Sequence, residues 1–122
     1  MGDWSKEPWG NDEAVDWFAR FWKHNDLTLA INEVVDFDPA HEKFDALRAA
    51  CYVLICFGHV YTWPTNMLSQ RGEILLQAVN LLEKMIDTND EWGFLDMWGN
   101  DAKIIQSVQF QIDSLHTLLT AK

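Results

Sequence analysis

Residues 41–61 read HEKFDALRAACYVLICFGHVY, and the fold class follows largely from this stretch. Its first turns are amphipathic, whereas from Ala49 onward the side chains are apolar on nearly every side. A helix that is apolar all round is normally buried, so we predict that this stretch forms the central helix. Pro64 and Asn66 then indicate a loop. The apolar part is too short to span a bilayer, which favours a core helix over a membrane span.

Helical spacing of apolar residues recurs on both sides of this stretch. Helices are expected to begin after Asn11 and Asp26, which are good N-caps, and near Ser69 and Asn100. Glu13 then adds negative charge to a first turn, where the helix dipole favours it. The predicted inward-facing residues are Ala14, Trp17, Phe18, Phe21 and Trp22; Leu27, Ala30, Ile31, Val34 and Val35; Leu75, Ala78, Val79, Leu82 and Ile86; and Ile105, Val108, Ile112, Leu115 and Leu119.

The rest of the chain adds no second domain. No segment alternates with a period of two for long enough to predict a strand, and no linker or repeat divides the sequence. Residues 94–99 are expected to form a short helical turn, and residues 1–10 an ordered arm pinned by Trp4 and Trp9. We therefore predict an all-α fold over residues 1–122, a compact single-domain bundle of about five helices with an ordered N-terminal arm.

The chain is strongly acidic, and the excess charge lies toward its two ends. Its 19 Asp and Glu residues face 9 Lys and Arg residues, which gives a net charge of -10. Residues 1–38 carry a balance of -6, residues 39–84 a balance of zero, and residues 85–122 a balance of -4. Such a surface repels nucleic acid and anionic lipid and attracts basic proteins. The expected partner is a basic protein, with no nucleic acid and no membrane.

No pattern in the sequence indicates catalysis, a cofactor or a metal. The histidines show no metal-ligand spacing, and there is neither a glycine-rich phosphate loop nor a nucleophile elbow. His59 lies in the apolar stretch, where we expect a hydrogen-bonded core residue rather than a ligand or base. We expect no enzyme activity, no catalytic residue, no cofactor and no metal site.

The cysteines and the start of the chain indicate a compartment. Cys51 and Cys56 are five residues apart, which suits neither a redox pair nor a zinc half-site, so we expect buried free thiols. Free thiols are typical of a reducing environment. The first residues lack the basic region and apolar core of a signal peptide. A cytoplasmic location is the expectation.

Acidic and aromatic residues are interleaved from Ile86 to Ala102, a stretch that contains no Lys or Arg. It consists of an acidic loop at 87–93 and the short helical turn that follows, and its residues 87–98 are called the connector below. This composition favours a protein interface, in which carboxylates steer a basic partner and aromatic rings anchor it. Whether the two indoles of the connector are exposed or belong to the core stays open at this point. The candidate partner-binding residues are Asp36, Asp38, Asp87, Asp90, Glu91, Trp92, Asp96 and Trp98.

The start of the chain also resembles a known family. Gly2-Asp3-Trp4, Pro8-Trp9 and the run NDEAVDW at 11–17 are similar to the opening of domain-of-unknown-function family 4259. The chain departs from that pattern with Ser5 in place of a usual glycine and Trp9 in place of a usual phenylalanine. The resemblance implies a compact bacterial helical domain. It implies no activity and no catalytic residues.

These observations favour a non-enzymatic protein-binding module. The leading hypothesis is an immunity protein, which binds and neutralises a basic toxin domain by placing carboxylates where the toxin would bind phosphates. The alternative is a homodimeric structural or regulatory adaptor that associates through an apolar helix face. The oligomeric state is either a monomer or a homodimer.

Overall fold

The computed structural model of the chain describes residues 6, 8, 10–24, 27–60 and 62–120, without the side chains of Phe18 and residues 21–24. These residues form helices joined by loops, with no β-strand among them, which confirms the all-α prediction. The elements are α1 (Asp12–His24), α2 (Thr28–Val35), the 3-10 helix η1 (Pro39–His41), α3 (Phe44–Phe57), the 3-10 helix η2 (Thr65–Gln70), α4 (Arg71–Met85), α5 (Phe94–Met97) and α6 (Ala102–Thr120).

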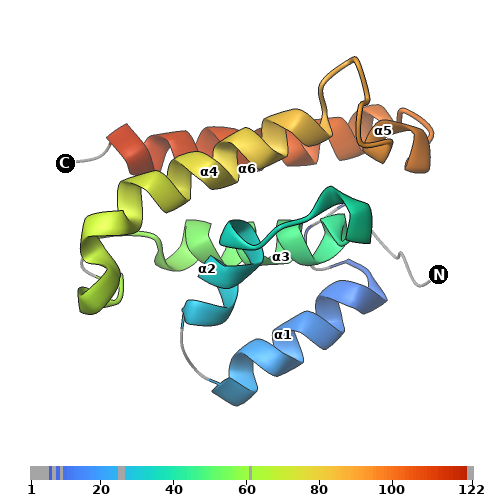
Figure 1. Cartoon of the computed structure of the whole chain (residues 1–122). Helices are drawn as coiled ribbons and strands as arrows, with labels where there is room; N and C mark the ends of the chain where they lie inside the picture. Colours follow the sequence, from blue (N-terminus) through green and yellow to red (C-terminus); the bar gives the residue numbers. More distant parts are fainter. Residues whose placement is uncertain (1–5, 7, 9, 25–26, 61, 121–122) are drawn as a thin grey trace.

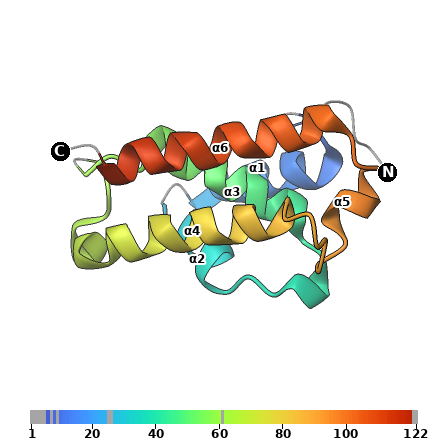
Figure 2. The same ribbon diagram turned by 90° about the horizontal axis from the view of Figure 1, so that it is seen from above.

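The helices are arranged in layers around α3. Helices α4 and α6 run side by side in opposite directions and form one layer (Figure 1, Figure 2). α3 lies under this pair, and α1 and α2 cover its other side (Figure 1). In the part of the chain that the structure describes, no helix is long and apolar enough to cross a membrane.

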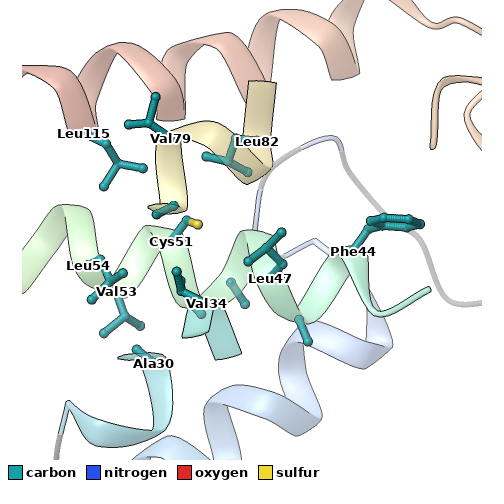
Figure 3. Close-up of a cluster of buried hydrophobic side chains, with 14 of the residues drawn as sticks. Ala30, Val34, Phe44, Leu47, Cys51, Val53, Leu54, Val79, Leu82 and Leu115 are labelled. Atoms are coloured by element: carbon teal, nitrogen blue, oxygen red, sulfur yellow. The ribbon is translucent and has the colours of Figure 1, made fainter. Parts of the chain in front are cut away.

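The prediction that α3 is the central helix is confirmed. Every residue from 46 to 51 is buried, and Val53 and Leu54 continue the buried set (Figure 3). α3 is nevertheless shorter than the 41–61 stretch that the sequence suggested. At its start, Pro39 opens a separate 3-10 turn and Glu42 has a left-handed backbone with φ of 53°, so the α-helix begins only at Phe44.

At the end of α3, the structure contradicts two expectations, one about His59 and one about Cys56. His59 lies beyond the helix in an exposed bend, so the prediction of a buried core histidine is wrong. Cys51 is buried as expected, but Cys56 is exposed because the last turn of α3 reaches the surface. Tyr61 lies outside the described residues.

The first two helices follow the predicted pattern where they are described. The Oδ1 atom of Asn11 accepts the N–H of Ala14 at 2.8 Å, which confirms the N-cap of α1. Trp17 is fully buried, whereas Phe18, Phe21 and Trp22 fall on side chains that are not described. In α2 the predicted inward position of Val35 is wrong, since 46% of this residue is exposed. The predicted cap Asp26 lies outside the described residues.

The C-terminal helices have the expected faces with a small change of register. In α6 the buried residue is Ile104, whereas Ile105 is only partly buried. The two isoleucines are adjacent, so apolar spacing alone does not distinguish them. α4 begins at Arg71 rather than near Ser69, because the intervening residues form η2. Of the N-terminal arm, Pro8 and Gly10 are buried, while Trp4 and Trp9 lie outside the described residues.

At one end of the bundle, the side chain of Arg71 links the ends of α3 and α6 to the start of α4. Arg71, at the start of α4, donates through Nε to the carbonyl oxygen of Gly58 at 2.6 Å. Its Nη2 donates to the carbonyl oxygen of Leu118 at 3.1 Å. Arg71 thereby satisfies carbonyl groups at the C-terminal ends of both α3 and α6, where the helix dipole favours a cation.

Candidate protein-interaction surface

The two acidic segments that the sequence identifies, residues 36–38 and the connector at 87–98, meet in the folded protein. Phe37 packs against Trp92 with 5.5 Å between ring centroids. Phe44, at the start of α3, lies 5.7 Å from Phe37 and 6.2 Å from Trp92. Aromatic contacts of this kind contribute about 1 kcal/mol each beyond the area that they bury. The connector is therefore held against the end of α2 and the start of α3.

The indoles of the connector are neither free nor fully buried. Trp92 and Trp98 are half-buried and pack on the hydrophobic core. Phe94 between them is fully buried and lies 5.5 Å from Phe44, edge to face. Each tryptophan thus has one part in the core and one part at the surface, where a partner can reach it.

Two of the predicted carboxylates serve the fold locally. The Oδ1 atom of Asp38 accepts the N–H of Ala40 at 2.9 Å and caps η1. Asp87 accepts the N–H of Asn89 at 3.0 Å in the turn that follows α4. Both side chains are exposed, and their hydrogen bonds are those that turn-forming aspartates usually make.

Asp90 has a larger structural role. Its backbone has φ of 48°, in the left-handed region that Asp tolerates better than most residues. Its Oδ1 accepts the N–H of Leu95 at 2.9 Å, and its Oδ2 accepts the N–H of Asp96 at 3.1 Å. Both carboxylate oxygens therefore hold the start of α5, and Asp90 positions the connector rather than offering charge to a partner.

The other predicted carboxylates lie closer to solvent. Glu91 forms an ion pair with Lys84, and the hydrogen bond and charge of Glu91 raise the pKa of Lys84. Asp36 and Asp96 are exposed, and among the described residues their carboxylates have no hydrogen bond or ion pair. These two are the predicted acids whose charge is most available to a partner.

A groove of about 420 Å³ lies beside the connector, between the start of α1, the start of α3 and α5. Its apolar floor is made by two phenylalanines, a methionine and Trp98, and three carboxylates stand around it. The described residues that line it include no Lys or Arg. The lining residues are Glu13, Glu42, Phe44, Asp45, Phe94, Met97 and Trp98.

Of the candidate partner-binding residues predicted from the sequence, only Trp98 lines this groove. Glu13 is recognisable in the sequence as a first-turn acid, but its partner is distant: Oε2 accepts the N–H of Ala46, 33 positions along, at 2.5 Å. Glu13 thus caps α3 from α1, and it brings the acidic starts of both helices to the same groove. Glu42 lies in the turn that precedes α3, and Asp45 lies in the first turn of α3. No local pattern marks these contacts, because they depend on how α1 packs against α3.

Trp98 also interacts with a cation from the chain itself. The Nζ atom of Lys6 lies 5.3 Å from the centroid of the Trp98 ring and 3.0 Å from Oδ2 of Asp101. A hydrogen bond from the backbone N–H of Lys103 and the contact with Lys6 lower the pKa of Asp101. Lys6 does not line the groove but a neighbouring hollow on α6. Trp98 thus contacts the Lys6 ammonium and also lines the groove.

A buried arginine positions the backbone of Lys6. Arg48 in α3 is 1% exposed, and its Nη2 donates to the carbonyl oxygen of Lys6 at 3.0 Å and to Oγ of Ser107 at 2.6 Å. Its Nε donates to Oε1 of Gln111 at 3.0 Å, and Nε2 of Gln111 donates back to the Arg48 carbonyl oxygen at 2.9 Å. The network joins α3, α6 and the N-terminal arm. No local pattern in the sequence predicts this network, because Gln111 lies 63 positions from Arg48.

In the described part of the chain, titratable side chains line a small hollow beside η1, namely those of Glu33, Asp36, Asp38, His41 and Lys43. No group of three or more His, Cys, Asp or Glu residues in the described chain has the geometry to hold a metal ion. Burial raises the pKa of the Cys51 thiol to about 12, against the opposing charge of Arg48, which keeps this thiol protonated near neutral pH. What the surface provides is exposed carboxylate charge beside accessible aromatic rings.

Comparison of the chain with protein-family models, with curated proteins and with solved structures gave no match in any of the three. The resemblance of the opening residues to family 4259 thus stays a prediction. Of the residues that suggest it, Gly2 to Trp4 and Trp9 lie outside the described residues, while Asn11 forms the cap of α1.

Proposed function

We propose that this protein is a non-enzymatic binding module for a basic protein partner. The observation that carries the proposal is the groove of about 420 Å³, with its apolar floor and its three carboxylates. Two exposed carboxylates belong to the same region: Asp96 in α5, and Asp36 next to the Phe37 ring that packs on Trp92. A net charge of -10 would attract a basic partner over a distance, and the aromatic rings would anchor it.

Within this class, the finer proposal is an immunity protein of the bacterial cytoplasm. Such a protein would bind a basic toxin domain and place its carboxylates in the groove that the toxin uses for phosphate groups. The high negative charge, the lack of any catalytic pattern in the sequence and the half-buried indoles Trp92 and Trp98 support this assignment.

The experiment is co-expression of the tagged chain with the product of the adjacent gene. A basic protein should copurify, and the chain should restore growth to cells in which that protein is toxic. Because steering by charge is screened, the association rate should fall steeply between low and high salt. If the chain neither retains its neighbour nor rescues growth, the immunity proposal is wrong.

A pair of charge reversals tests the surface itself. Asp36→Lys with Asp96→Lys changes the two available acids and should weaken partner binding by about tenfold or more. Glu73→Lys with Asp113→Lys makes the same charge change on exposed positions near the start of α4 and in the C-terminal half of α6, toward the other end of the bundle. Equal weakening by both pairs would show that only the net charge matters and would contradict a defined surface.

One observation favours a second candidate, a homodimeric adaptor. Phe110 on α6 is 70% exposed, beside a shallow hollow of about 590 Å³ lined by Lys6, Lys103, Gln106 and Ser107. The exposed ring and the hollow beside it provide surface to which a second copy of the chain could bind. Sedimentation equilibrium decides this point: a dimer that withstands salt and dissociates in the Phe110→Ser variant would favour the adaptor.

A further inference from the structure

The groove between α1, α3 and α5 has the shape and chemistry to enclose one side chain of a partner. Its volume of about 420 Å³ falls in the range of pockets that hold small ligands. Phe44 and Phe94 form the inner part of its floor, and both are buried. Met97, which is 51% exposed, stands at the opening, where its flexible thioether can adapt to an occupant.

The charge around the groove fits a cation. The carboxylates of Glu13, Glu42 and Asp45 come from two separate elements, and no described residue of the lining carries a positive charge. Glu13 caps α3, and Asp45, which is half-buried, also interacts within the chain. Glu42 is the exposed acid at the outer rim. An occupant with one positive charge would therefore meet carboxylates at the rim and aromatic carbon at the floor.

Trp98 shows how a cation interacts with this part of the surface. The ammonium of Lys6 lies 5.3 Å from its ring centroid and is also paired with Asp101. This is the arrangement of an aromatic ring and a carboxylate that together hold a lysine. Trp98 also lines the groove, and Lys6 is not among the described residues of that lining.

We infer that the groove is the recognition pocket for a single arginine side chain of the basic partner. The guanidinium would stack on Trp98 and pair with Glu42, the exposed acid of the rim, and Asp45 would add its negative charge. Arginine fits better than lysine because its planar group stacks on aromatic rings, forms bidentate hydrogen bonds with carboxylates and is more weakly hydrated than an ammonium. The inference rests on the proposed function and specifies what its partner must present.

The test uses the full chain and a nona-arginine peptide, with binding measured by isothermal titration calorimetry. Met97→Lys places a permanent cation at the opening of the groove and should weaken peptide binding by about tenfold or more. Leu76→Lys is the matched control: Leu76 lies on α4 and is 48% exposed, so the charge change and the exposure are nearly equal. We expect this control to change the affinity by about twofold or less, since Leu76 is not among the residues that line the groove and salt screens charges on the rest of the surface.

Nuclear magnetic resonance locates the peptide on the protein. The indole N–H signal of Trp98, assigned as the one that disappears in Trp98→Phe, should shift on addition of the peptide and should not shift in Met97→Lys. A nona-lysine peptide of equal charge should bind about threefold more weakly or worse, because an ammonium gains less from stacking. Equal binding of the two peptides would overturn the choice of arginine.

The results also separate this inference from the proposed function. If Met97→Lys and Leu76→Lys weaken peptide binding equally, or if the Trp98 signal does not move, the pocket assignment is wrong. A basic partner could still copurify with the chain in that case, and the binding function would stand. If no basic partner is found but the Trp98 signal shifts as expected, the pocket stands and the immunity proposal falls.

Discussion

At one end of the bundle α3 and α6 finish and α4 begins, and Arg71 lies between these helix ends. At the other end α3 and α6 begin, and carboxylates stand around the connector (Figure 1). We refer to the first as the closed end, defined by Gly58, Arg71 and Leu118. The second is the acidic end, defined by the groove and the connector at 87–98. For α3 and α6, the charge at each end has the sign that the helix dipole favours.

The difference lies in how much of that charge the fold uses. At the closed end the guanidinium of Arg71 donates to two carbonyl oxygens and is half-buried. At the acidic end Asp90 is used in the same way, but Asp36 and Asp96 have no partner among the described residues. Substitutions at the closed end should therefore affect stability most, and those at the acidic end should affect binding.

The largest effect is expected from Gly58→Ala at the closed end. The added Cβ would lie 2.1 Å from the carbonyl oxygen of Leu54 and 2.9 Å from Cδ1 of Leu118, so the ends of α3 and α6 would have to move apart. We expect a loss of about 3 kcal/mol in the free energy of unfolding, the upper range for overpacking. Urea denaturation followed by circular dichroism measures it.

Gly72→Ala is the matched control for that change. Gly72 lies in the first turn of α4, and a Cβ there would meet nothing within 4 Å. Alanine is the better helix former, so this variant should be more stable than the parent by about 0.5 kcal/mol. A similar loss in both variants would mean that the close approach at Gly58 does not hold the closed end together.

The next largest effect is expected from Arg71→Met. Methionine keeps the apolar stem but removes the donors to Gly58 and Leu118, which leaves two partly buried carbonyl groups without their charged partner. We expect a loss of about 2 kcal/mol in the free energy of unfolding. Arg20→Met, at an exposed position of α1, should change it by less than about 0.5 kcal/mol. Equal effects of the two substitutions would contradict the role of Arg71.

The sequence predicted which helices form better than it predicted where each helix begins and ends. The buried run at 46–51 makes α3 recognisable as the central helix because, apart from Arg48, its side chains are apolar or small. The boundaries were missed where the cause is not periodic: the left-handed Glu42 before α3, the crowded Gly58 after it, and the 3-10 residues before α4. These features depend on backbone geometry and on contacts with other helices.

The candidate surface was predicted only in part for a similar reason. Acids interleaved with aromatics identified the connector, and Phe37 joins it to the acids at 36 and 38. Composition does not show which carboxylate serves the fold, so Asp90 and Asp96 looked equivalent in the sequence. The Glu13–Ala46 contact and the buried Arg48 depend on residues far apart in the chain. Only the packing of α1 and α6 on α3 brings them together.

At the acidic end, Asp90→Asn and Asp96→Asn remove the same charge with different consequences. Asn tolerates the left-handed backbone of residue 90 but loses one of two carboxylate acceptors, so we expect a loss of about 1 kcal/mol in the free energy of unfolding. Asp96→Asn should leave the unfolding midpoint unchanged and weaken binding of a basic partner. If the two variants are equally stable, Asp90 does not hold the start of α5.

The smallest effect is expected from the exposed pair of Lys6 and Asp101, and it is best seen in the pH dependence of stability. The pKa of Asp101 is lowered in the folded protein from its ordinary value of 3.8, chiefly by the N–H of Lys103 and then by Lys6. A carboxyl with a lowered pKa binds its proton more weakly when folded than when unfolded. Its stabilising contribution is therefore complete above the unfolded pKa of about 3.9 and is lost as the pH falls through the folded value.

The melting temperature of Asp101→Asn should lie below that of the parent at pH 7 and converge with it in strong acid. A gap that stays constant down to pH 2 would mean that Asp101 acts through packing and not through its charge.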